Sequence, residues 1–362
     1  MEVNLTPWIP EQVTMAWLSN ILSKSSNYKD SKIIGLTSQP ISPGRGFSGQ
    51  VHRYFIKYSH KASKTIPETI IGKFSSQNQV TKKFLRNYSI NEISAYREFS
   101  QSTNQLLPKT YFMAINEKEG NICLLLEDLD STSKYNVDLL SFEQYEFAVK
   151  KIAEFHAIWR KKPRPKWARP ARALTGHTNK IMSRNIWKFL ELYRDHLGND
   201  FRQLLNEYPN QSHKIFPRST NAYTTITHGD FRPDNFFILK SISNNLELKV
   251  IDWQLTSQGH GIWDISYLTA WGVPIENRRE WEQQIKDIYR ETMDLGYPDY
   301  DLSTQMEVEY LRGFLIAIQI LVIAASEFSD QSERGEKLIR TTTDRINMII
   351  EDHNLLKFLR NL

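Results

Sequence analysis

The chain has 362 residues and a mass of 42.5 kDa, which is long enough for a large core and by length alone predicts two domains or two lobes. Its composition of 40% hydrophobic and 24% charged residues excludes a disordered, charge-solvated coil. The net charge of +5 comes from Lys and Arg residues spread along the chain, so we expect no nucleic-acid partner. The single cysteine, Cys123, excludes an internal disulfide and favours a reducing, cytoplasmic compartment.

Neither a secretory signal nor a membrane span is expected. The first residues have no basic segment followed by an apolar run. The longest apolar run, from Phe314 to Ala325, is shorter than the roughly 20 residues of a membrane-spanning helix and carries Gln319. We therefore predict a buried helix in that region and no membrane partner.

Residues 1–126 are predicted to form a small, sheet-rich front lobe that begins with a helix from Ile9 to about Lys24. Short segments rich in β-branched and aromatic residues, bounded by Gly, Pro, Asn or Ser, indicate an antiparallel sheet. They lie near residues 32–37, 51–58, 68–74, 109–115 and 121–126. A helix that starts near Ile90, with apolar residues at three- and four-residue spacing, interrupts them.

A hinge is predicted at residues 127–131, and residues 132–362 are predicted to form a larger, mainly helical rear lobe. Helical periodicity covers residues 142–160, 178–207, 277–295, 304–328 and 332–359. Residues 235–253 are the exception, because two apolar runs flank an Asn-rich turn and predict a hairpin. The expected fold class is therefore α+β with two lobes.

The front lobe contains a glycine pattern made by Gly44, Gly46 and Gly49. The dinucleotide-binding form of this pattern requires a helix directly after the glycines, but the residues that follow here predict a strand. A glycine loop between two strands lets backbone N–H groups approach phosphates, which is the arrangement in kinases. A hairpin without a ligand is the alternative for this pattern taken alone.

Lys73 stands in an otherwise apolar strand, where a lysine is costly to bury without a partner. Glu92 lies early on the following helix, and its carboxylate could reach that strand. We expect the two to form an ion pair that positions nucleotide phosphates. Either residue alone is more typical of a solvated charge; their order after the glycine pattern favours the pair.

The strongest signal is THGDFRPDNFF at residues 227–237, followed by VIDWQ at residues 250–254. Asn235 and Asp252 flank the predicted hairpin and offer amide and carboxylate oxygens, which Mg²⁺ binds beside phosphate and water. Asp230 is not needed as a metal ligand, so we expect it to orient an acceptor hydroxyl and accept its proton. Arg232 could contact the phosphoryl group that is transferred. The two segments predict a magnesium–nucleotide site, with an ordinary turn as the alternative.

Three further polar residues are predicted to have structural roles. His228 is expected to hold the loop in shape, and Asp264 to cap or brace the same loop. His156, on an apolar helix face, is expected to be a satisfied core histidine. Aromatic residues near the loop could offer faces to an acceptor: Trp253, Trp263, Tyr267 and Trp271.

The segment HGDFRPDN followed by IDWQ resembles the motifs of the aminoglycoside phosphotransferase and choline kinase superfamily, whose members are small-molecule kinases with a protein-kinase-like fold. The Gln after IDW, together with AEFHAIW and GIWDISYL, is most similar to the ecdysteroid-kinase-like branch. The resemblance runs from about Gly44 to about Leu268 and implies a bilobal fold with a small antiparallel-sheet lobe and a larger helical lobe.

The same resemblance implies a role for each matching residue. It makes Asp230 the catalytic base, Asn235 and Asp252 the Mg²⁺ ligands, Lys73 and Glu92 the phosphate-positioning pair, and the backbone from Glu127 to Leu129 the contact for the adenine of ATP. Some features depart from protein kinases: HGD replaces HRD, Arg232 stands where a lysine is usual, and DFG and APE do not occur. A peptide-docking surface is therefore not expected.

We accordingly expect an ATP- and Mg²⁺-dependent kinase that phosphorylates a hydroxyl of a small metabolite or natural product, as a monomer or a homodimer. An aminoglycoside or a choline- or ethanolamine-type acceptor is an alternative. A non-catalytic nucleotide-binding pseudokinase is another, although its usual mark is the loss of Asp230, Asn235 or Asp252, and all three are present. Phosphorylation of protein partners is a further alternative.

Overall fold

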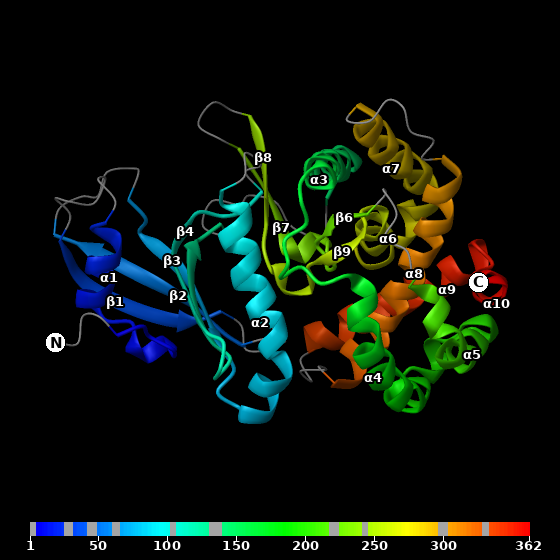
Figure 1. Ribbon diagram of the computed structural model, residues 1–362, viewed down its shortest axis with the longest axis horizontal. Helices are drawn as coiled ribbons and strands as arrows, with labels where there is room; N and C mark the ends of the chain where they lie inside the picture. Colours follow the sequence, from blue (N-terminus) through cyan, green and yellow to red (C-terminus); the bar gives the residue numbers. More distant parts are fainter. Residues whose placement is uncertain are drawn as a thin grey trace. The chain divides into compact units, whose positions relative to one another are not determined.

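The computed structural model describes residues 5–24, 32–41, 49–59, 66–101, 106–129, 140–216, 224–240, 245–295, 303–327 and 333–362. The chain divides into two compact units (Figure 1). The first unit holds residues 1–135 and 237–254, and the second holds residues 136–236 and 255–362. In this division residues 127–135 and the segment 237–254 group with the front of the chain.

The first unit is built on a five-stranded antiparallel sheet with the strand order β1-β2-β3-β5-β4 (Figure 1). The strands are β1 (Ile33–Pro40), β2 (Gly49–Tyr58), β3 (Thr69–Ser75), β4 (Thr110–Asn116) and β5 (Asn121–Glu127). All five segments predicted as strands are strands. β3 and β5 are central, which explains why their side chains are mostly buried.

The beginning of the chain covers part of this sheet. The predicted leading helix is a 3₁₀ turn, Pro10–Gln12, followed by the shorter helix α1 (Met15–Leu22), which begins where the Thr14 side chain accepts a hydrogen bond from the Trp17 N–H. The Trp17 ring packs edge-on against Phe112 at 5.0 Å. The Tyr54 hydroxyl from β2 donates to the carbonyl of Pro10 at 2.9 Å, so this segment is tied to the sheet by both apolar and polar contacts.

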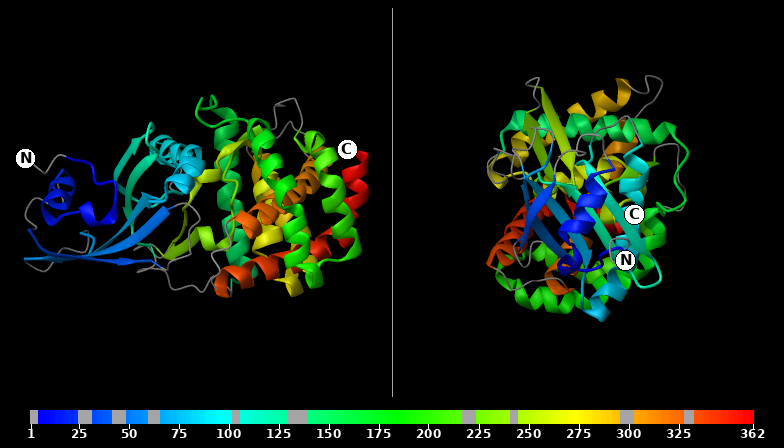
Figure 2. Two further views of the ribbon diagram at one scale, coloured as in Figure 1. Left: turned by 90° about the horizontal axis from the view of Figure 1, so that it is seen from below. Right: turned by 90° about the vertical axis from the view of Figure 1, so that its left-hand side faces the viewer.

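Helix α2 (Gln79–Phe99) packs against β4 and β5 (Figures 1 and 2). It starts earlier than the sequence pattern predicts, because Asn78 caps it: the Asn78 side chain accepts hydrogen bonds from the N–H groups of Val80 and Thr81. The face that packs on the sheet carries the buried Glu92. α2 therefore brings a carboxylate to the inner side of the first unit.

The predicted hairpin is present as β7 (Phe236–Lys240) and β8 (Leu246–Val250). All of it except Phe236 belongs to the first unit, where the Val250 N–H donates to the Leu106 carbonyl at 2.6 Å. Trp253, directly after the hairpin, is fully buried and lies edge-on to Phe99 at 5.0 Å. These contacts fix the segment that carries Asp252.

The second unit is mainly helical, as predicted. Its helices are α3 (Phe142–Lys161), α4 (Ala171–Leu192), α5 (Asn199–Ile215), α6 (Ile262–Trp271), α7 (Ile275–Leu295), α8 (Ser303–Glu327), α9 (Glu333–Asp352) and α10 (Leu355–Asn361). Two short strands, β6 (Thr224–Thr227) and β9 (Ser257–His260), pair antiparallel. Neither of the single helices predicted at 178–207 and 332–359 is continuous. The first is interrupted between Leu192 and Asn199, where a 3₁₀ turn, Arg194–His196, intervenes, and the second at Asn354, whose φ is 49°.

Helix α8 contains the apolar run noted in the sequence. By length and composition its residues Gln305–Ser326 could cross a membrane, but 72% of the apolar window is buried inside the protein. α8 packs along α6 and α4. The prediction of a buried helix in this region is confirmed.

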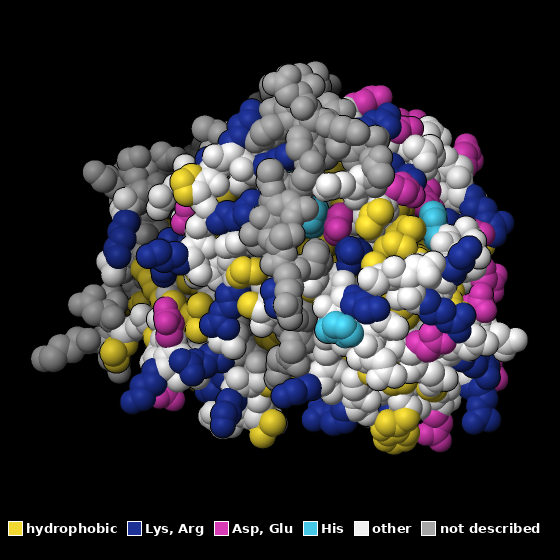
Figure 3. Space-filling model, turned by 45° about the vertical axis from the view of Figure 1, so that its right-hand side comes forward, with side chains coloured by type: hydrophobic (Ala, Val, Ile, Leu, Met, Phe, Trp, Pro, Cys, Tyr) yellow, Lys and Arg dark blue, Asp and Glu magenta, His cyan; other side chains and the backbone are white. Residues whose placement is uncertain are grey.

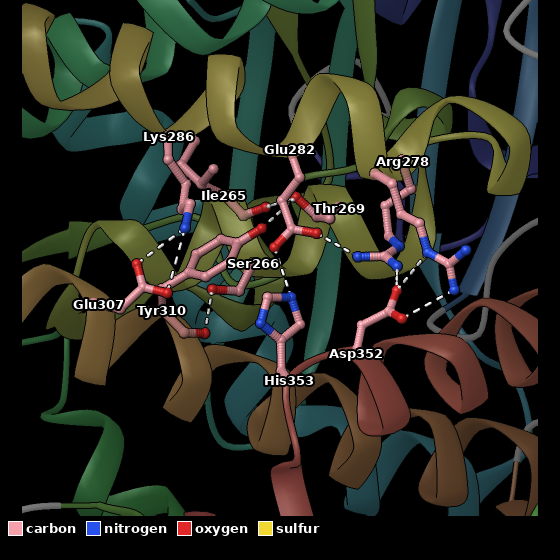
Figure 4. Close-up of polar contacts among 11 residues, drawn as sticks. Ile265, Ser266, Thr269, Arg278, Glu282, Lys286, Glu307, Tyr310, Asp352 and His353 are labelled. Carbon is pink, nitrogen blue, oxygen red and sulfur yellow. Dashed lines mark hydrogen bonds and ion pairs between the residues drawn. The ribbon is translucent and has the colours of Figure 1, made fainter.

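Helix α7 places three charged residues on its buried side, Arg278, Glu282 and Lys286 (Figure 4). Arg278 pairs with Glu282 one turn later and with Asp352 at the end of α9. The Nζ atom of Lys286 lies 3.0 Å from a carboxylate oxygen of Glu307 on α8. Since buried charges are tolerated only when they are paired, this network attaches α7 to both α8 and α9.

Charge on the surface is mixed. On the face drawn in Figure 3, Lys and Arg side chains are scattered and do not gather in one block. This agrees with their even spacing along the sequence.

Candidate active site

The first polar cluster lies in the first unit and joins three elements. Lys73 extends from β3, Glu92 comes from α2, and Asp252 follows β8. The Lys73 Nζ atom lies 2.7 Å from Glu92 Oε1 and 3.0 Å from Asp252 Oδ1. The ion pair expected between Lys73 and Glu92 is thus formed, and Asp252 joins it.

Burial and charge act in opposite directions on this cluster. Burial lowers the pKa of Lys73, but the Asp252 and Glu92 carboxylates raise it more, so the pKa lies above its ordinary value. Burial raises the pKa of Glu92; Lys73 lowers it and Asp252 raises it, and the net direction is upward. One ammonium therefore faces two carboxylates, an arrangement with a surplus of negative charge that suits a further cation.

Asp252 has an unusual backbone. Its φ is 64°, in the left-handed region that few residues other than glycine adopt, although Asp and Asn adopt it more readily than most. Its Oδ2 atom also accepts a long hydrogen bond of 3.4 Å from Gln254 Nε2. Such strained backbone conformations concentrate at functional sites. Here the conformation turns the Asp252 carboxylate toward Lys73.

The predicted nucleotide-binding glycines are only partly described. Gly44 and Gly46 lie outside the described residues. Gly49 is the first residue of β2, where a Cβ atom would lie 1.9 Å from the carbonyl oxygen of Phe74. Glycine is therefore required at position 49 by close strand contact, and the phosphate role of the three glycines stays a prediction.

The predicted adenine contact lies at the end of β5. The Glu127 N–H donates to the Lys109 carbonyl at 2.8 Å, and the Glu127 side chain accepts from the Lys109 N–H at 3.1 Å. Leu129 is buried, with 3% of its surface exposed. The backbone of this segment is thus held in place, and its contact with adenine stays a prediction.

The second polar cluster lies in the second unit, in the loop after β6. Asn235 donates from Nδ2 to the Asp230 side chain at 2.8 Å and to the Asp230 carbonyl at 2.9 Å. Arg232 donates from Nε to the other carboxylate oxygen of Asp230 at 3.2 Å. Asp230 is only 8% exposed. Both oxygens of the predicted base are therefore held by donors from its own loop.

Arg232 is fixed by more than Asp230. Its Nη1 atom donates to Asp234 Oδ2 at 2.6 Å, and Asp234 in turn accepts from Arg334 at 2.9 Å. Its guanidinium carbon lies 5.6 Å from the centre of the Trp271 ring, a cation–π distance. These contacts show that Arg232 orients the loop; its contact with a phosphoryl group stays a prediction.

The start of this loop is held by Asp264 on α6, which is 1% exposed. The carboxylate accepts from the His228 N–H at 2.6 Å and from the Gly229 N–H at 2.8 Å. The His228 ring accepts from the Asp230 N–H at 3.1 Å. The structural roles predicted for His228 and Asp264 are confirmed, since both shape the loop through its backbone.

Gly229 is required for this shape. Its φ is 84°, and a Cβ atom there would lie 2.5 Å from the Leu255 carbonyl oxygen. The loop therefore turns at a position where any other residue would be strained. His156, fully buried on α3, lies 3.1 Å from Asp264 Oδ2 and 3.1 Å from the Tyr289 hydroxyl, so it is the satisfied core histidine that was predicted.

One neighbour of the loop after β6 was not predicted. The buried Tyr267 phenol lies near the Asp230 carboxylate, and burial together with that charge raises the pKa of Tyr267. Tyr267 was expected only as an aromatic face, yet it lies three residues after Asp264 and so on the same side of α6. That spacing is the signal in the sequence that could have indicated this neighbour.

The predicted site residues thus form two groups. Lys73, Glu92 and Asp252 come together in the first unit, and Asp230 and Asn235 in the second. Because Asn235 and Asp252 fall in different units, their sharing of one metal ion stays a prediction.

Comparison with known proteins identifies the family. The ecdysteroid kinase-like family matches residues 43–295, more than half of the chain. The chain belongs to the ecdysteroid kinase-like family. The resemblance noted in the sequence is therefore confirmed, including the branch of the superfamily. Among curated proteins, none matches this ecdysteroid kinase-like chain.

Solved structures show the fold of this ecdysteroid kinase-like protein. A microcompartment-associated aminopropanol kinase is 11% identical, with a TM-score of 0.55 over 94% of this chain and 98% of that one. Choline kinase from Cryptosporidium parvum is also 11% identical, with a TM-score of 0.53 over 93% and 96%. Amicoumacin kinase hAmiN is 13% identical, with a TM-score of 0.52 over 86% and 88%. The predicted α+β, kinase-like fold is thus confirmed.

Proposed function

We propose that this protein is an ATP- and Mg²⁺-dependent kinase that transfers the γ-phosphoryl group of ATP to a hydroxyl of a small metabolite or natural product. Membership of the ecdysteroid kinase-like family supports a small-molecule kinase. The observation that carries the proposal is the Asp230 side chain, which Asn235 and Arg232 hold on both carboxylate oxygens. A carboxylate oriented in this way can align an acceptor hydroxyl and accept its proton.

The residues present fit a magnesium ion. Asn235 directs its amide nitrogen to Asp230, so its carbonyl oxygen, in the same plane, is not used by that contact and points away from it. Asp252 adds a carboxylate, and both are hard oxygen ligands of the kind Mg²⁺ prefers. When bound, the ion would neutralise charge on the nucleotide phosphates. We propose Asn235 and Asp252 as its protein ligands.

For the nucleotide, we propose that Lys73 binds the phosphates and that Glu92 orients it. Lys73 stays charged in the protein because its two carboxylate partners outweigh the effect of burial on its pKa. Glu92 is 2% exposed and reaches Lys73 at 2.7 Å, so it restricts the direction of the lysine side chain. Gly44, Gly46, Gly49 and the backbone from Glu127 to Leu129 are proposed to complete the ATP site.

The aromatic side chains near the loop favour a neutral acceptor. Trp253 is fully buried in the first unit, and Trp263 is 9% exposed. Trp271 is stacked on Tyr267 at 5.3 Å, and its ring already contacts a cation of the protein itself, the Arg232 guanidinium. These rings are thus already packed or paired with a cation. We therefore favour a neutral polyhydroxylated acceptor such as an ecdysteroid, with choline-type alcohols and aminoglycosides as alternatives.

The test is a transfer assay with the full chain, Mg²⁺ and ATP labelled on the γ-phosphate. Candidate acceptors are an ecdysteroid, choline, ethanolamine, aminopropanol and an aminoglycoside, with the Asp230→Asn variant as the control. We expect a labelled phosphate ester with the wild-type chain and at least about a hundredfold less with the variant. Label on protein would indicate a protein kinase. Tight ATP binding without transfer to any acceptor or to water would indicate a pseudokinase.

A further inference from the structure

The sheet of the first unit has two different faces. Tyr54 and Phe74 lie on one face and are buried in an apolar core that includes residues of α1. Side chains alternate along a strand, so Lys73 and Ile71 lie on the opposite face. In the pairing of β2 with β3, Arg53 stands opposite Ile71. Arg53 therefore shares the face of the sheet that carries Lys73.

The Arg53 side chain crosses β3 and reaches Asp128, the residue directly after β5. Its Nε atom lies 2.7 Å from Asp128 Oδ2, and its Nη2 atom lies 3.1 Å from Oδ1. The Asp128 side chain is 1% exposed and that of Arg53 is 25% exposed. A bidentate pair with a buried carboxylate fixes both the position and the direction of that carboxylate. The backbone after β5 is thus held from β2, a strand that is not its neighbour in the sheet.

The pair and Lys73 occupy different places along the same face. Lys73 stands opposite Leu124 in the pairing of β3 with β5, and Asp128 follows Leu124 by four residues. At about 3.3 Å per residue, this separates the levels of Lys73 and Asp128 by about 13 Å along the strand direction. A nucleoside triphosphate can span such a distance. A nucleotide held by its phosphates at Lys73 could therefore bring its base to residues 127–129.

We propose that Arg53 is a positioning residue for the nucleotide base, because through Asp128 it holds the backbone from Glu127 to Leu129 in the conformation that contacts the adenine. The inference rests on the proposed function, in which this segment is the adenine contact. A backbone that is fixed before the ligand arrives loses less conformational freedom on binding. Loss of the pair should therefore weaken the part of the affinity that the base contributes and leave the part from the phosphates unchanged.

The test measures these two parts of the affinity separately. Calorimetry of the full chain with Mg²⁺ gives one Kd for a non-hydrolysable ATP analogue and another for inorganic tripolyphosphate, which has the phosphates without the base. Arg53→Met breaks the pair but leaves a buried carboxylate without this partner. The double variant Arg53→Met/Asp128→Asn breaks the pair without that charge, so it carries the test even where the single variant fails to fold.

Arg360→Met is the matched control. The Arg360 guanidinium also donates to both oxygens of one carboxylate, that of Glu207, but in the second unit. Its removal should leave the affinity for both ligands unchanged. Thermal unfolding of each variant is recorded in parallel.

We expect the wild-type chain to bind the ATP analogue more tightly than tripolyphosphate. The double variant should bind the analogue about tenfold more weakly, which corresponds to the loss of about one hydrogen bond to the base. Its affinity for tripolyphosphate should stay within about twofold, because Lys73 and Glu92 are unchanged. Arg53→Lys keeps the charge but not the bidentate contact, so its affinity for the analogue should fall between those of the wild type and the double variant.

The possible failures point to different steps. An unchanged affinity of the double variant for the analogue, or an equal loss for both ligands, would overturn the positioning role and leave the proposed function intact. The same holds if the wild-type chain binds the two ligands equally, since the base would then add nothing. Binding of the analogue without binding of tripolyphosphate would contradict the placement of the phosphates at Lys73 and so overturn the inference. A wild-type chain that binds neither ligand would overturn the proposed function, and this inference with it.

Discussion

Replacement of Lys73 by methionine measures how far the first polar cluster depends on its single cation. The Nζ atom lies 2.7 Å from Glu92 and 3.0 Å from Asp252. With an effective dielectric constant of about 20, each contact corresponds to roughly 6 kcal/mol of attraction. The two carboxylate oxygens lie within about 5.7 Å of each other, the sum of those distances, and repel by roughly 3 kcal/mol or more. Without Lys73, the buried Glu92 carboxylate would face the partly exposed Asp252 carboxylate.

We therefore expect Lys73→Met to lower the free energy of unfolding by about 3–5 kcal/mol at neutral pH, less than the Coulomb attractions because desolvation opposes them. The loss should shrink as the pH falls. Burial and Asp252 already favour a raised pKa for Glu92, and without Lys73 nothing in the cluster opposes them, so Glu92 takes up a proton. The double variant Lys73→Met/Glu92→Gln should recover most of the stability.

The assay is urea unfolding of the full chain without nucleotide, at neutral pH and near pH 5. Lys151→Met serves as the matched control, because Lys151 forms an exposed pair with Glu154 at 2.9 Å on α3. Such surface pairs contribute about 0–1 kcal/mol. A cost for Lys73→Met no greater than that of Lys151→Met would refute the reasoning, as would a double variant no more stable than the single one.

Three further substitutions test the surroundings of the site. Asp264→Asn should cost about 2–3 kcal/mol in chemical unfolding, because an amide has one acceptor oxygen for the two loop N–H groups and leaves a buried donor unpaired. Tyr96→Phe should stabilise the protein by about 1 kcal/mol in the same assay, since this buried hydroxyl has no hydrogen-bond partner among the described residues; a loss of stability would contradict this. Burial, aided by nearby arginines such as Arg312, lowers the pKa of His260 from 6.5 to about 4. The unfolded chain therefore binds a proton at this histidine at a higher pH than the folded chain does. As the pH falls from 6.5 to about 4, the free energy of unfolding should drop by about 3 kcal/mol on account of His260, and unfolding curves of His260→Gln should lack this part of the pH dependence.

The front sheet could be predicted because each strand is short, rich in β-branched or aromatic residues and bounded by turn residues. The elements that were missed have no such pattern. All ten residues of α6 are buried, so no polar face marks its helical period. The four residues of β6 are also all buried and show no alternation. Fully buried elements leave no periodic signal, and these two lie next to the loop that carries Asp230.

Helix boundaries were harder to predict than helices. The apolar periodicity at 178–207 and at 332–359 continues across an interruption of the helix, because the helices on both sides of the interruption bury an apolar face. At Asn354 the left-handed φ of 49° ends one helix and starts the next. Asn adopts this conformation more readily than most residues, but a single Asn in a periodic segment is a weak signal.

Within the candidate site, the sequence predicts the chemical roles of residues better than it predicts which residues contact each other. The roles of Asp230, Asn235 and Asp252 follow from ligand type and order, and the structure pairs the first two directly. Tyr267 and Asp230 are far apart in the sequence, and the packing of α6 on the loop brings them near each other. The spacing of Asp264 and Tyr267 places both on one face of α6, but only the fold shows which part of the loop that face meets.

In both polar clusters a carboxylate links elements that are separate in the sequence. In the first, β3 supplies Lys73 to Asp252 and Glu92. In the second, α6 supplies Asp264, which accepts from the N–H groups of His228 and Gly229 just before Asp230. Because partners from separate elements cannot shift together without unpacking the core, each carboxylate is oriented before any ligand binds. Catalysis that relies on positioning gains most from such preorganisation, so substitutions behind the two carboxylates should slow turnover more than they weaken ATP binding.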